Sequence, residues 1–276
     1  MEPNLDLITV PAGSIALSDR RTSRRWTVEV AAFRLAAAPV NQALYAEVTG
    51  ERPSNTRGDL LPVEGVSWWD ALQFCNALSA REGRTPAYRL LPADSSLPAH
   101  SSSPAHSSSP AHSSSPAHSS RPAHGRFSAG GRVDNEGRLL ADGDLLPSDD
   151  EPGVLWDRSA DGYRLPTEAE WEHACRAGTT EARYGPLDEI AWYRGNSGER
   201  IHEPGGKLPN AWGLHDMLGN AWDWCWDVYD AEVYGTYRVL RGGGWFDEQW
   251  SCRASVRRRS HPSLRIDDVS FRVARG

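Results

Sequence analysis

The stretch of the sequence that decides the fold is Gly213-Leu-His-Asp-Met-Leu-Gly-Asn-Ala-Trp-Asp-Trp-Cys-Trp-Asp227. It has the pattern of a turn followed by a strand. Trp222, Trp224 and Trp226 recur with a period of two, so their indoles leave the same face of a pleated strand. At about 25 cal/mol per Å² and about 150–250 Å² per indole, the three offer roughly 10–15 kcal/mol of gross transfer free energy. We therefore predict that this face is core and that the opposite face is not.

The composition indicates a globular protein with a loop-rich fold. The chain has 276 residues, of which 39% are apolar, enough for a sizeable core. Twelve Trp and 25 Gly against two Met favour an interior filled by aromatic side chains. The formal charge of −7 argues against nucleic acid or an anionic membrane as partner. Residues 1–10 lack a signal-peptide pattern and no window has the length of a membrane span, so we expect a cytoplasmic protein.

Local patterns predict strands at residues 5–17 and 25–35, as edge strands of a sheet, and three helices. The helices are expected to begin after Asn41, Ser67 and Thr167, each of which has the side chain of an N-cap. Cys75 and Cys175 fall on the apolar stripes of the second and third helix and are interpreted as core residues. The acidic residues of the third helix, Glu168, Glu170 and Glu172, suit the positive end of its dipole, and we interpret them as stabilising and solubilising.

A repeat of Pro-Ala-His and serine occupies residues 98–124. Such a composition buries too little apolar surface to offset its ordering entropy, so we predict a disordered insertion over residues 92–152. Histidines six residues apart on a flexible chain have no preset geometry for a metal. We therefore interpret the segment as an insertion within a single domain that covers residues 1–276.

Four ordered motifs resemble the sulfatase-modifying-factor family, which includes the formylglycine-generating enzymes. They are Tyr163-Arg-Leu-Pro-Thr-Glu-Ala-Glu-Trp-Glu172, Asn210 to Trp224, Arg241-Gly-Gly-Gly-Trp245 and Phe271-Arg-Val273. The resemblance implies a C-type-lectin-like fold of the α+β class, with a twisted antiparallel sheet, two main helices and much irregular structure. It also implies three branches of function, because one fold carries several.

The first implied function is oxidation of a thiol in a peptide or small molecule, using molecular oxygen and Cu(I) held by two cysteines. By resemblance, the first of these positions falls on Cys252 and the second on Arg257, which has no sulfur to donate. Cys225 is the candidate replacement, so Cys252 and Cys225 are the predicted catalytic residues. Fe²⁺ is an alternative metal, although the His-x₃-His-x-Glu motif of the related sulfoxide synthases is missing.

The turn before the decisive strand offers hard oxygen ligands. Asn220, the Ala221 carbonyl and Asp223 form a compact donor set of the kind that Ca²⁺ prefers. The resemblance also implies a structural calcium at this turn, usually with Glu where Asp223 stands. We therefore predict a structural calcium site here.

The third branch, after the thiol oxidases and the sulfoxide synthases, implies a non-catalytic binding module that presents its ligand surface near the C-terminus. Arginines at 253 and 257–259 permit two interpretations, either ion pairs that fix the loops or a pocket for an anionic ligand. The predicted substrate-binding residues are Trp245, Phe246, Trp250, Arg257, Arg259 and His261. The sequence does not specify the substrate or the oligomeric state.

Overall fold

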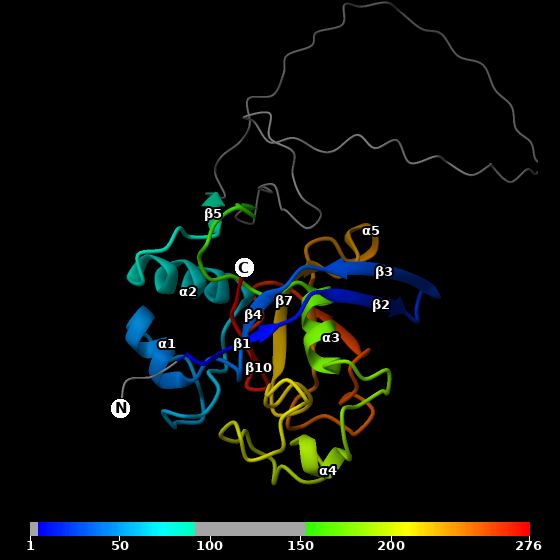
Figure 1. Ribbon diagram of the computed structural model, residues 1–276. Coiled ribbons are helices and arrows are strands. Elements are labelled where there is room, and N and C mark those ends of the chain that lie inside the picture. The colour runs from blue at the N-terminus through cyan, green and yellow to red at the C-terminus, as the bar shows by residue number, and fades with distance from the viewer. Residues whose placement is uncertain (1–4, 92–152) are drawn as a thin grey trace, which may run out of the picture. The chain divides into compact units, whose positions relative to one another are not determined.

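The computed structural model of the protein describes residues 5–91 and 153–276. The chain divides into two compact units, Met1–Arg89 with Trp156–Gly276, and Leu90–Leu155. The histidine repeat and the predicted insertion at 92–152 lie outside the described residues, so the insertion stays a prediction. The first unit contains the helices and the candidate site (Figure 1).

The described residues form an α+β structure of small sheets and few helices, which confirms the predicted fold class. The helices are α1 (Gln42–Thr49), α2 (Trp68–Arg81), α3 (Glu168–Arg176), α4 (Leu187–Ile190) and α5 (Ala231–Tyr234). The strands are β1 (Leu7–Val10), β2 (Gly13–Asp19), β3 (Arg24–Val30), β4 (Phe33–Ala36), β5 (Tyr88–Leu91), β6 (Gly153–Trp156), β7 (Trp222–Val228), β8 (Arg238–Arg241), β9 (Arg257–Ser260), β10 (Val269–Ser270) and β11 (Ala274–Arg275).

Two sheets organise the first unit. One has the order β10-β7-β8-β9, in which β10 and β7 are parallel and the other pairs antiparallel. The other is antiparallel and has the order β1-β4-β11, so that strands from the two ends of the chain flank β4. β2 and β3 pair as a separate hairpin, and β5 pairs with β6. The two strand segments expected at 5–17 and 25–35 are thus four strands, and β4 is central rather than an edge strand.

The three predicted helix starts are confirmed. The Asn41 side chain accepts a hydrogen bond from the backbone N–H of Leu44 at 2.8 Å, and Ser67 and Thr167 each form a capping box. These bonds satisfy N–H groups that the first turn of a helix leaves without a partner. They also fix where α3 begins, and with it the positions of the acidic side chains of that helix.

The prediction that only one face of β7 is core was wrong, because residues 222–226 are all buried. The indole face packs towards α2, where Trp68 lies 5.4 Å from Trp226 between ring centroids. The opposite face meets α3, whose Trp171 indole donates to Asp223 at 2.9 Å. β7 is therefore a central strand covered on both faces, which a period-two pattern alone does not reveal.

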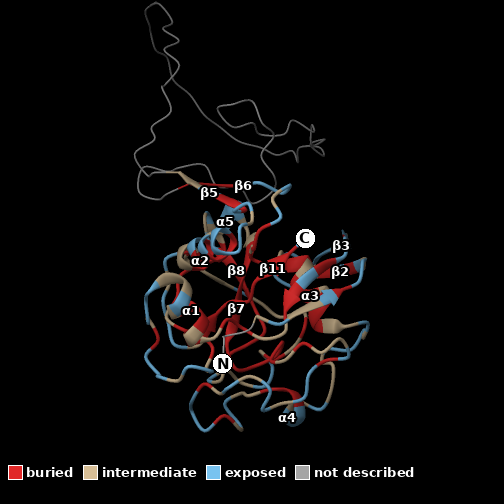
Figure 2. Cartoon of the chain, turned by 60° about the vertical axis from the view of Figure 1, so that its left-hand side comes forward, coloured by how far each residue is buried: buried red, intermediate tan, exposed pale blue. Residues whose placement is uncertain are grey.

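Figure 2 shows buried residues concentrated along β7 and β8, with α4 and the surrounding loops more exposed. Among the described residues, we find no helix that is both long and apolar enough to span a membrane. The central strands therefore form the buried core, against which α3 and the loop that follows β8 are placed.

Candidate functional site

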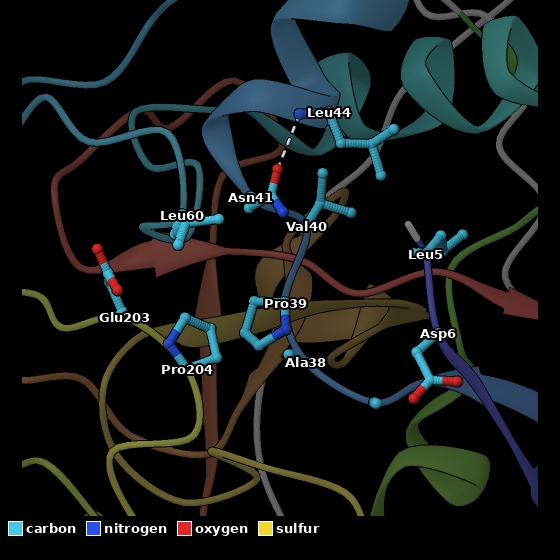
Figure 3. A pocket seen from close by; sticks show the side chains of 11 residues that line it. Leu5, Asp6, Ala38, Pro39, Val40, Asn41, Leu44, Leu60, Glu203 and Pro204 are labelled. Carbon is cyan, nitrogen blue, oxygen red and sulfur yellow. Dashed lines mark hydrogen bonds between the residues drawn. The ribbon is translucent and has the colours of Figure 1, made fainter. Parts of the chain in front are cut away.

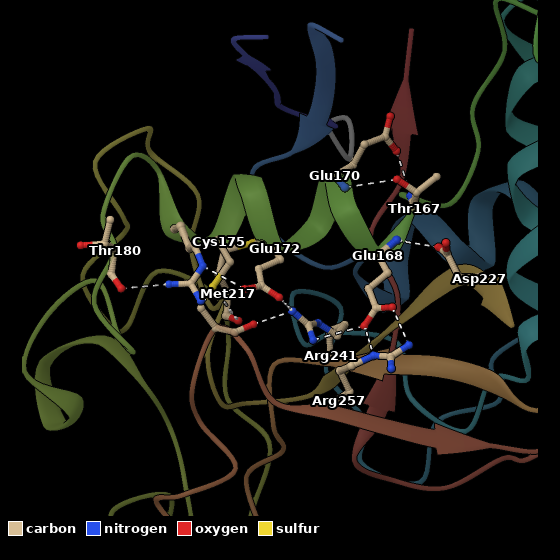
Figure 4. Close-up of polar contacts among 12 residues, drawn as sticks. Thr167, Glu168, Glu170, Glu172, Cys175, Thr180, Met217, Asp227, Arg241 and Arg257 are labelled. Carbon is tan, nitrogen blue, oxygen red and sulfur yellow. Dashed lines mark hydrogen bonds and ion pairs between the residues drawn. The ribbon is translucent and has the colours of Figure 1, made fainter. Parts of the chain in front are cut away.

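A buried ion network joins α3 to strands β8 and β9 of the β10-β7-β8-β9 sheet (Figure 4). The side chain of Arg241 is fully buried and pairs with both Glu168, at 3.3 Å, and Glu172. It also donates to the Ala254 carbonyl at 2.6 Å. The interpretation of Glu168 and Glu172 as solubilising residues was wrong, because they are 3% and 1% exposed and hold buried guanidinium groups.

Arg257 belongs to the same network. Its guanidinium donates to Glu168, with Nη2 at 2.8 Å from Oε2, and lies 3.7 Å from Asp19. The residue at the position implied for the second copper cysteine is therefore engaged with a buried carboxylate. Arg257 fixes β9 against α3.

The N-terminus of α3 faces a further carboxylate. Asp227 accepts the backbone N–H of Glu168 at 2.6 Å. Burial, together with the negative charge of Glu168, raises the pKa of Asp227 to about 6, although the N–H bond opposes the shift. This group therefore titrates near neutrality in the folded protein.

The surroundings of Cys252 do not fit a two-thiolate copper site. Cys252 is fully buried, and burial raises the pKa of its thiol to about 12. Cys225 is also buried in the same apolar cluster, and its pKa lies well above the ordinary value for the same reason. Within residues 5–91 and 153–276, no group of three or more His, Cys, Asp or Glu side chains is placed to hold a metal. Cys252 and Cys225 as catalytic residues stay a prediction.

Two of the predicted calcium donors, Asn220 and one oxygen of Asp223, already have hydrogen-bond partners. Asn220 accepts the backbone N–H of His202 at 2.9 Å through its amide oxygen and donates to the His202 carbonyl. One oxygen of Asp223 accepts from Trp171 and, at 2.7 Å, from Arg272. The other oxygen of Asp223, Oδ1, is buried without a hydrogen-bond partner among the described residues, so it could still serve as a cation ligand, and the role of Asn220, Ala221 and Asp223 in calcium binding stays a prediction. Arg272 is fully buried and its Nε lies 2.7 Å from Asp223, so its role is structural.

Three of the predicted substrate-binding residues lie together on the loop that follows β8. Phe246 and Trp250 are 51% and 57% exposed, whereas Trp245 is half-buried and makes an edge contact with Phe246 at 5.4 Å. We call Trp245, Phe246 and Trp250 the aromatic surface. Exposed aromatic residues that neighbour each other on an ordered loop are typical of recognition surfaces.

The other three predicted substrate-binding residues lie on or just after β9. Arg257 and Arg259 leave the same face of the strand and approach Tyr229, with the guanidinium carbons 4.5 and 5.3 Å from the ring centroid. His261 contacts the Tyr237 ring edge-on. The side chain of Arg258 points to the other face, where it lies over Trp222 and pairs with Asp247 at 3.4 Å. The predicted set therefore divides between two places.

Two hollows were not predicted from the sequence. One, of about 220 Å³, brings Arg20 and Arg21 beside Arg253 and Arg257. The other, of about 230 Å³, lies where residues 37–41 meet Leu5 and Pro204 (Figure 3). The amide oxygen of Asn41 in that second hollow is engaged as the α1 cap, and the wall is largely apolar, so we assign no chemistry to it. The paired arginines at 20–21 are the sequence signal that could have indicated the first hollow.

The small sheets and few helices define the described residues as an α+β protein. The chain belongs to the sulfatase-modifying factor enzyme 1-like domain family, whose model matches residues 1–276. No single residue decides this assignment, which covers the chain as a whole.

Similar proteins include a protein named as a chaperone and a protein named as an enzyme. The chain is 26% identical over 268 residues to the chaperone protein LppX of Paenibacillus barcinonensis, covering 87% of this chain and 78% of that protein. It is 32% identical over 146 residues to the formylglycine-generating enzyme of Streptomyces coelicolor, covering 41% of this chain and 46% of that enzyme. The chain thus spans less than half of that enzyme's length.

Among solved structures, variable protein 1 of Treponema denticola superposes with a TM-score of 0.70 and 26% sequence identity. The match covers 98% of this chain and 94% of that chain. The likeness therefore extends over nearly the whole of both molecules.

Proposed function

We propose that the protein is a binding module that recognises a protein or peptide partner through the aromatic surface. The observation that carries the proposal is the exposure of Phe246 and Trp250, 51% and 57%, on a loop held by an extensive set of hydrogen bonds. Aromatic side chains on an ordered backbone give large contact areas at a low cost in conformational entropy. The near full-length likeness to a variable protein supports the same proposal.

The loop is fixed on both sides of Trp245. The backbone N–H of Trp245 donates to the Asn220 carbonyl at 2.8 Å, and the Trp245 carbonyl accepts from the Ser197 hydroxyl at 2.9 Å. Its indole donates to the carbonyl of Asp267 at 3.0 Å. Asp247 adds a bond from Trp222 at 2.6 Å. A partner would therefore meet a preorganised surface, which lowers the entropy lost on binding.

The aromatic surface has a polar neighbour. Arg194 pairs with Glu248 at 3.1 Å, and its guanidinium carbon lies 5.3 Å from the Phe246 ring centroid. Both charged side chains are about half exposed, so they contribute to specificity more than to affinity. An apolar centre with a polar rim is the common arrangement of protein interfaces.

The oxidase hypothesis rests on the family and on Cys252. In the structure, the Cys252 thiol is buried, and Arg257, at the position implied for the second cysteine, is bound to Glu168. We therefore rank it below the binding proposal. Elemental analysis after copper and iron loading tests it, with Cys252→Ser as the comparison. Copper or iron near one atom per chain that disappears in the variant would favour an oxidase.

The binding proposal is tested by selecting peptides against the wild-type protein and measuring their affinity for variants. We expect Trp250→Ala and Phe246→Ala each to weaken binding by about tenfold or more, since anchor residues contribute about 2 kcal/mol. Leu208→Ala is the matched control, because Leu208 is 56% exposed and lies outside the aromatic surface. Selected peptides whose affinity is unchanged by Trp250→Ala and Phe246→Ala would contradict the proposal.

A further inference from the structure

The hollow beside the β2–β3 hairpin is built from three parts of the chain. The end of β2 and the hairpin turn form one wall, the loop before β9 forms another, and Tyr229 lies where β7 has ended. The volume is about 220 Å³, and the lining residues are Ser18, Asp19, Arg20, Arg21, Tyr229, Arg253, Ser255, Val256 and Arg257. We call this hollow the arginine pocket.

The lining carries more positive than negative charge. Four arginines line it against one acid, Asp19, although the whole chain has a formal charge of −7. Burial works against ionisation of Asp19, but hydrogen bonds from Arg21 and Thr22 and the charge of Arg257 hold its pKa below the usual range. Asp19 is therefore an anion that offsets a single guanidinium.

Two of the four arginines are engaged elsewhere. Arg257 is bound to Glu168, and Arg21 pairs with Asp230. Arg20 and Arg253 form no ion pair within residues 5–91 and 153–276, and both line the pocket. The pocket thus has two guanidinium groups with donors available for a ligand.

The rest of the lining suits the same kind of ligand. Ser18, Ser255 and Tyr229 contribute hydroxyl groups, which can donate to an oxyanion. Arg257 is held in the lining by two contacts. It donates to Glu168, and its guanidinium carbon lies 4.5 Å from the Tyr229 ring centroid. A ligand therefore meets a wall that is already ordered on one side.

A third hollow, of about 300 Å³, continues the basic surface along the hairpin. It shares Ser18, Asp19 and Arg20 with the arginine pocket and adds Ser23, Arg24 and Arg25. Arg24 and Arg25 are exposed, and the guanidinium carbon of Arg24 lies 5.1 Å from the Trp26 ring centroid. A ligand with two linked oxyanion groups could therefore contact both hollows through Arg20.

We infer that the arginine pocket binds the phosphate group of a phosphorylated small molecule, and that a diphosphate binds more tightly than a monophosphate. Guanidinium groups bind phosphate oxygens through paired, charge-assisted hydrogen bonds. The site is separate from the aromatic surface and does not depend on the function proposed for it. A solvated basic face with no ligand is the competing interpretation.

Titration calorimetry with inorganic phosphate and with pyrophosphate tests the inference on the full chain. We expect pyrophosphate to bind more tightly than phosphate, and both to bind more weakly as salt is added. The double variant Arg20→Gln/Arg253→Gln should weaken pyrophosphate binding at least tenfold. Arg20→Lys/Arg253→Lys should bind with intermediate affinity, because lysine keeps the charge and loses the paired donors.

The matched control is Arg34→Gln/Arg200→Gln. It removes the same charge from two exposed arginines outside both hollows. We expect its affinity to stay within twofold of wild type. An equal loss in both Gln double variants would overturn the inference in favour of non-specific attraction, as would the absence of binding by the wild-type protein at millimolar pyrophosphate. An unchanged melting temperature of the unliganded Gln and Lys variants confirms that affinity, not folding, is being measured.

Discussion

Replacing Arg241 by Met should destabilise the fold strongly, because this guanidinium lies between two buried carboxylates. Glu168 and Glu172 would keep Arg257 and Arg176 as partners, but the local charge would become more negative by one unit in a buried place. The Ala254 carbonyl would also lose its donor. Removing one member of a buried ion pair costs about 3–5 kcal/mol. This is a large part of the 5–15 kcal/mol by which domains are typically stable.

Urea unfolding followed by tryptophan fluorescence measures the change. We expect a lower midpoint at an unchanged dependence on urea, and a melting temperature lower by roughly 6–20 °C, from about 2–4 °C per kcal/mol. Arg52→Met is the matched control, because Arg52 and its partner Asp59 are 50% and 66% exposed. That exposed pair should contribute less than about 1 kcal/mol.

A second variant separates lost charge pairing from lost packing. Arg241→Lys keeps the positive charge and loses the planar group with its paired donors, so it should lose less stability than Arg241→Met. A loss below about 1 kcal/mol in Arg241→Met would refute the reasoning. An equal loss in both variants would assign the effect to the packing of the guanidinium against Trp171, which lies 5.2 Å from the guanidinium carbon.

Other expected outcomes concern the pH response, a cap, a close contact and the thiols. Burial raises the pKa of Asp227 to about 6, so this carboxyl contributes stability that is fully present below about pH 4 and is lost as the pH rises through 6. Asp227→Asn keeps an acceptor for the Glu168 N–H. Its free energy of unfolding relative to wild type should be about 1–3 kcal/mol higher at pH 8 than at pH 4. Asn41→Ala should lower the free energy of unfolding by about 1 kcal/mol, whereas Asn41→Ser should retain most of it. Gly219→Ala should cost more than Gly205→Ala in the same assay; both have positive φ, but an alanine Cβ at 219 would lie 2.3 Å from the Trp192 carbonyl oxygen and the one at 205 meets nothing within 4 Å. All four cysteines are buried, so mass spectrometry should find no alkylation of the folded protein and four alkylated thiols after denaturation; rapid modification of Cys252 in the folded state would contradict its assigned burial.

The sequence predicted the helix starts because a cap is a local interaction. Asn41, Ser67 and Thr167 each bond a backbone N–H three residues on, within reach of any short-range pattern. The period-two indoles of β7 likewise identified which side chains share a face. Whether a second element covers the opposite face depends on α3, and no pattern within the strand contains that information.

The sequence indicated which types of residue the candidate site would contain, but not which of them would contact each other in the folded protein. Phe246 and Trp250 are exposed, and their part in ligand binding stays a prediction. The partner of Arg257 was missed because Glu168 lies far away in the sequence and looked like an ordinary first-turn acid. The arginine pocket was missed for the same reason, since hairpin and C-terminal loop meet only in the folded molecule.

The pairing of β4 bears on how the protein is made. β4 (Phe33–Ala36) has β1 on one edge and β11 (Ala274–Arg275) on the other, so its two partners lie on opposite sides of it in the sequence and β11 is far away. During synthesis, one edge of β4 must stay open until β11 has left the ribosome. An open edge can pair with another chain, and contacts between distant segments form slowly. The newly made protein should therefore be most prone to aggregation just before β11 emerges, and a chaperone that shields strand edges would raise its yield most at that moment.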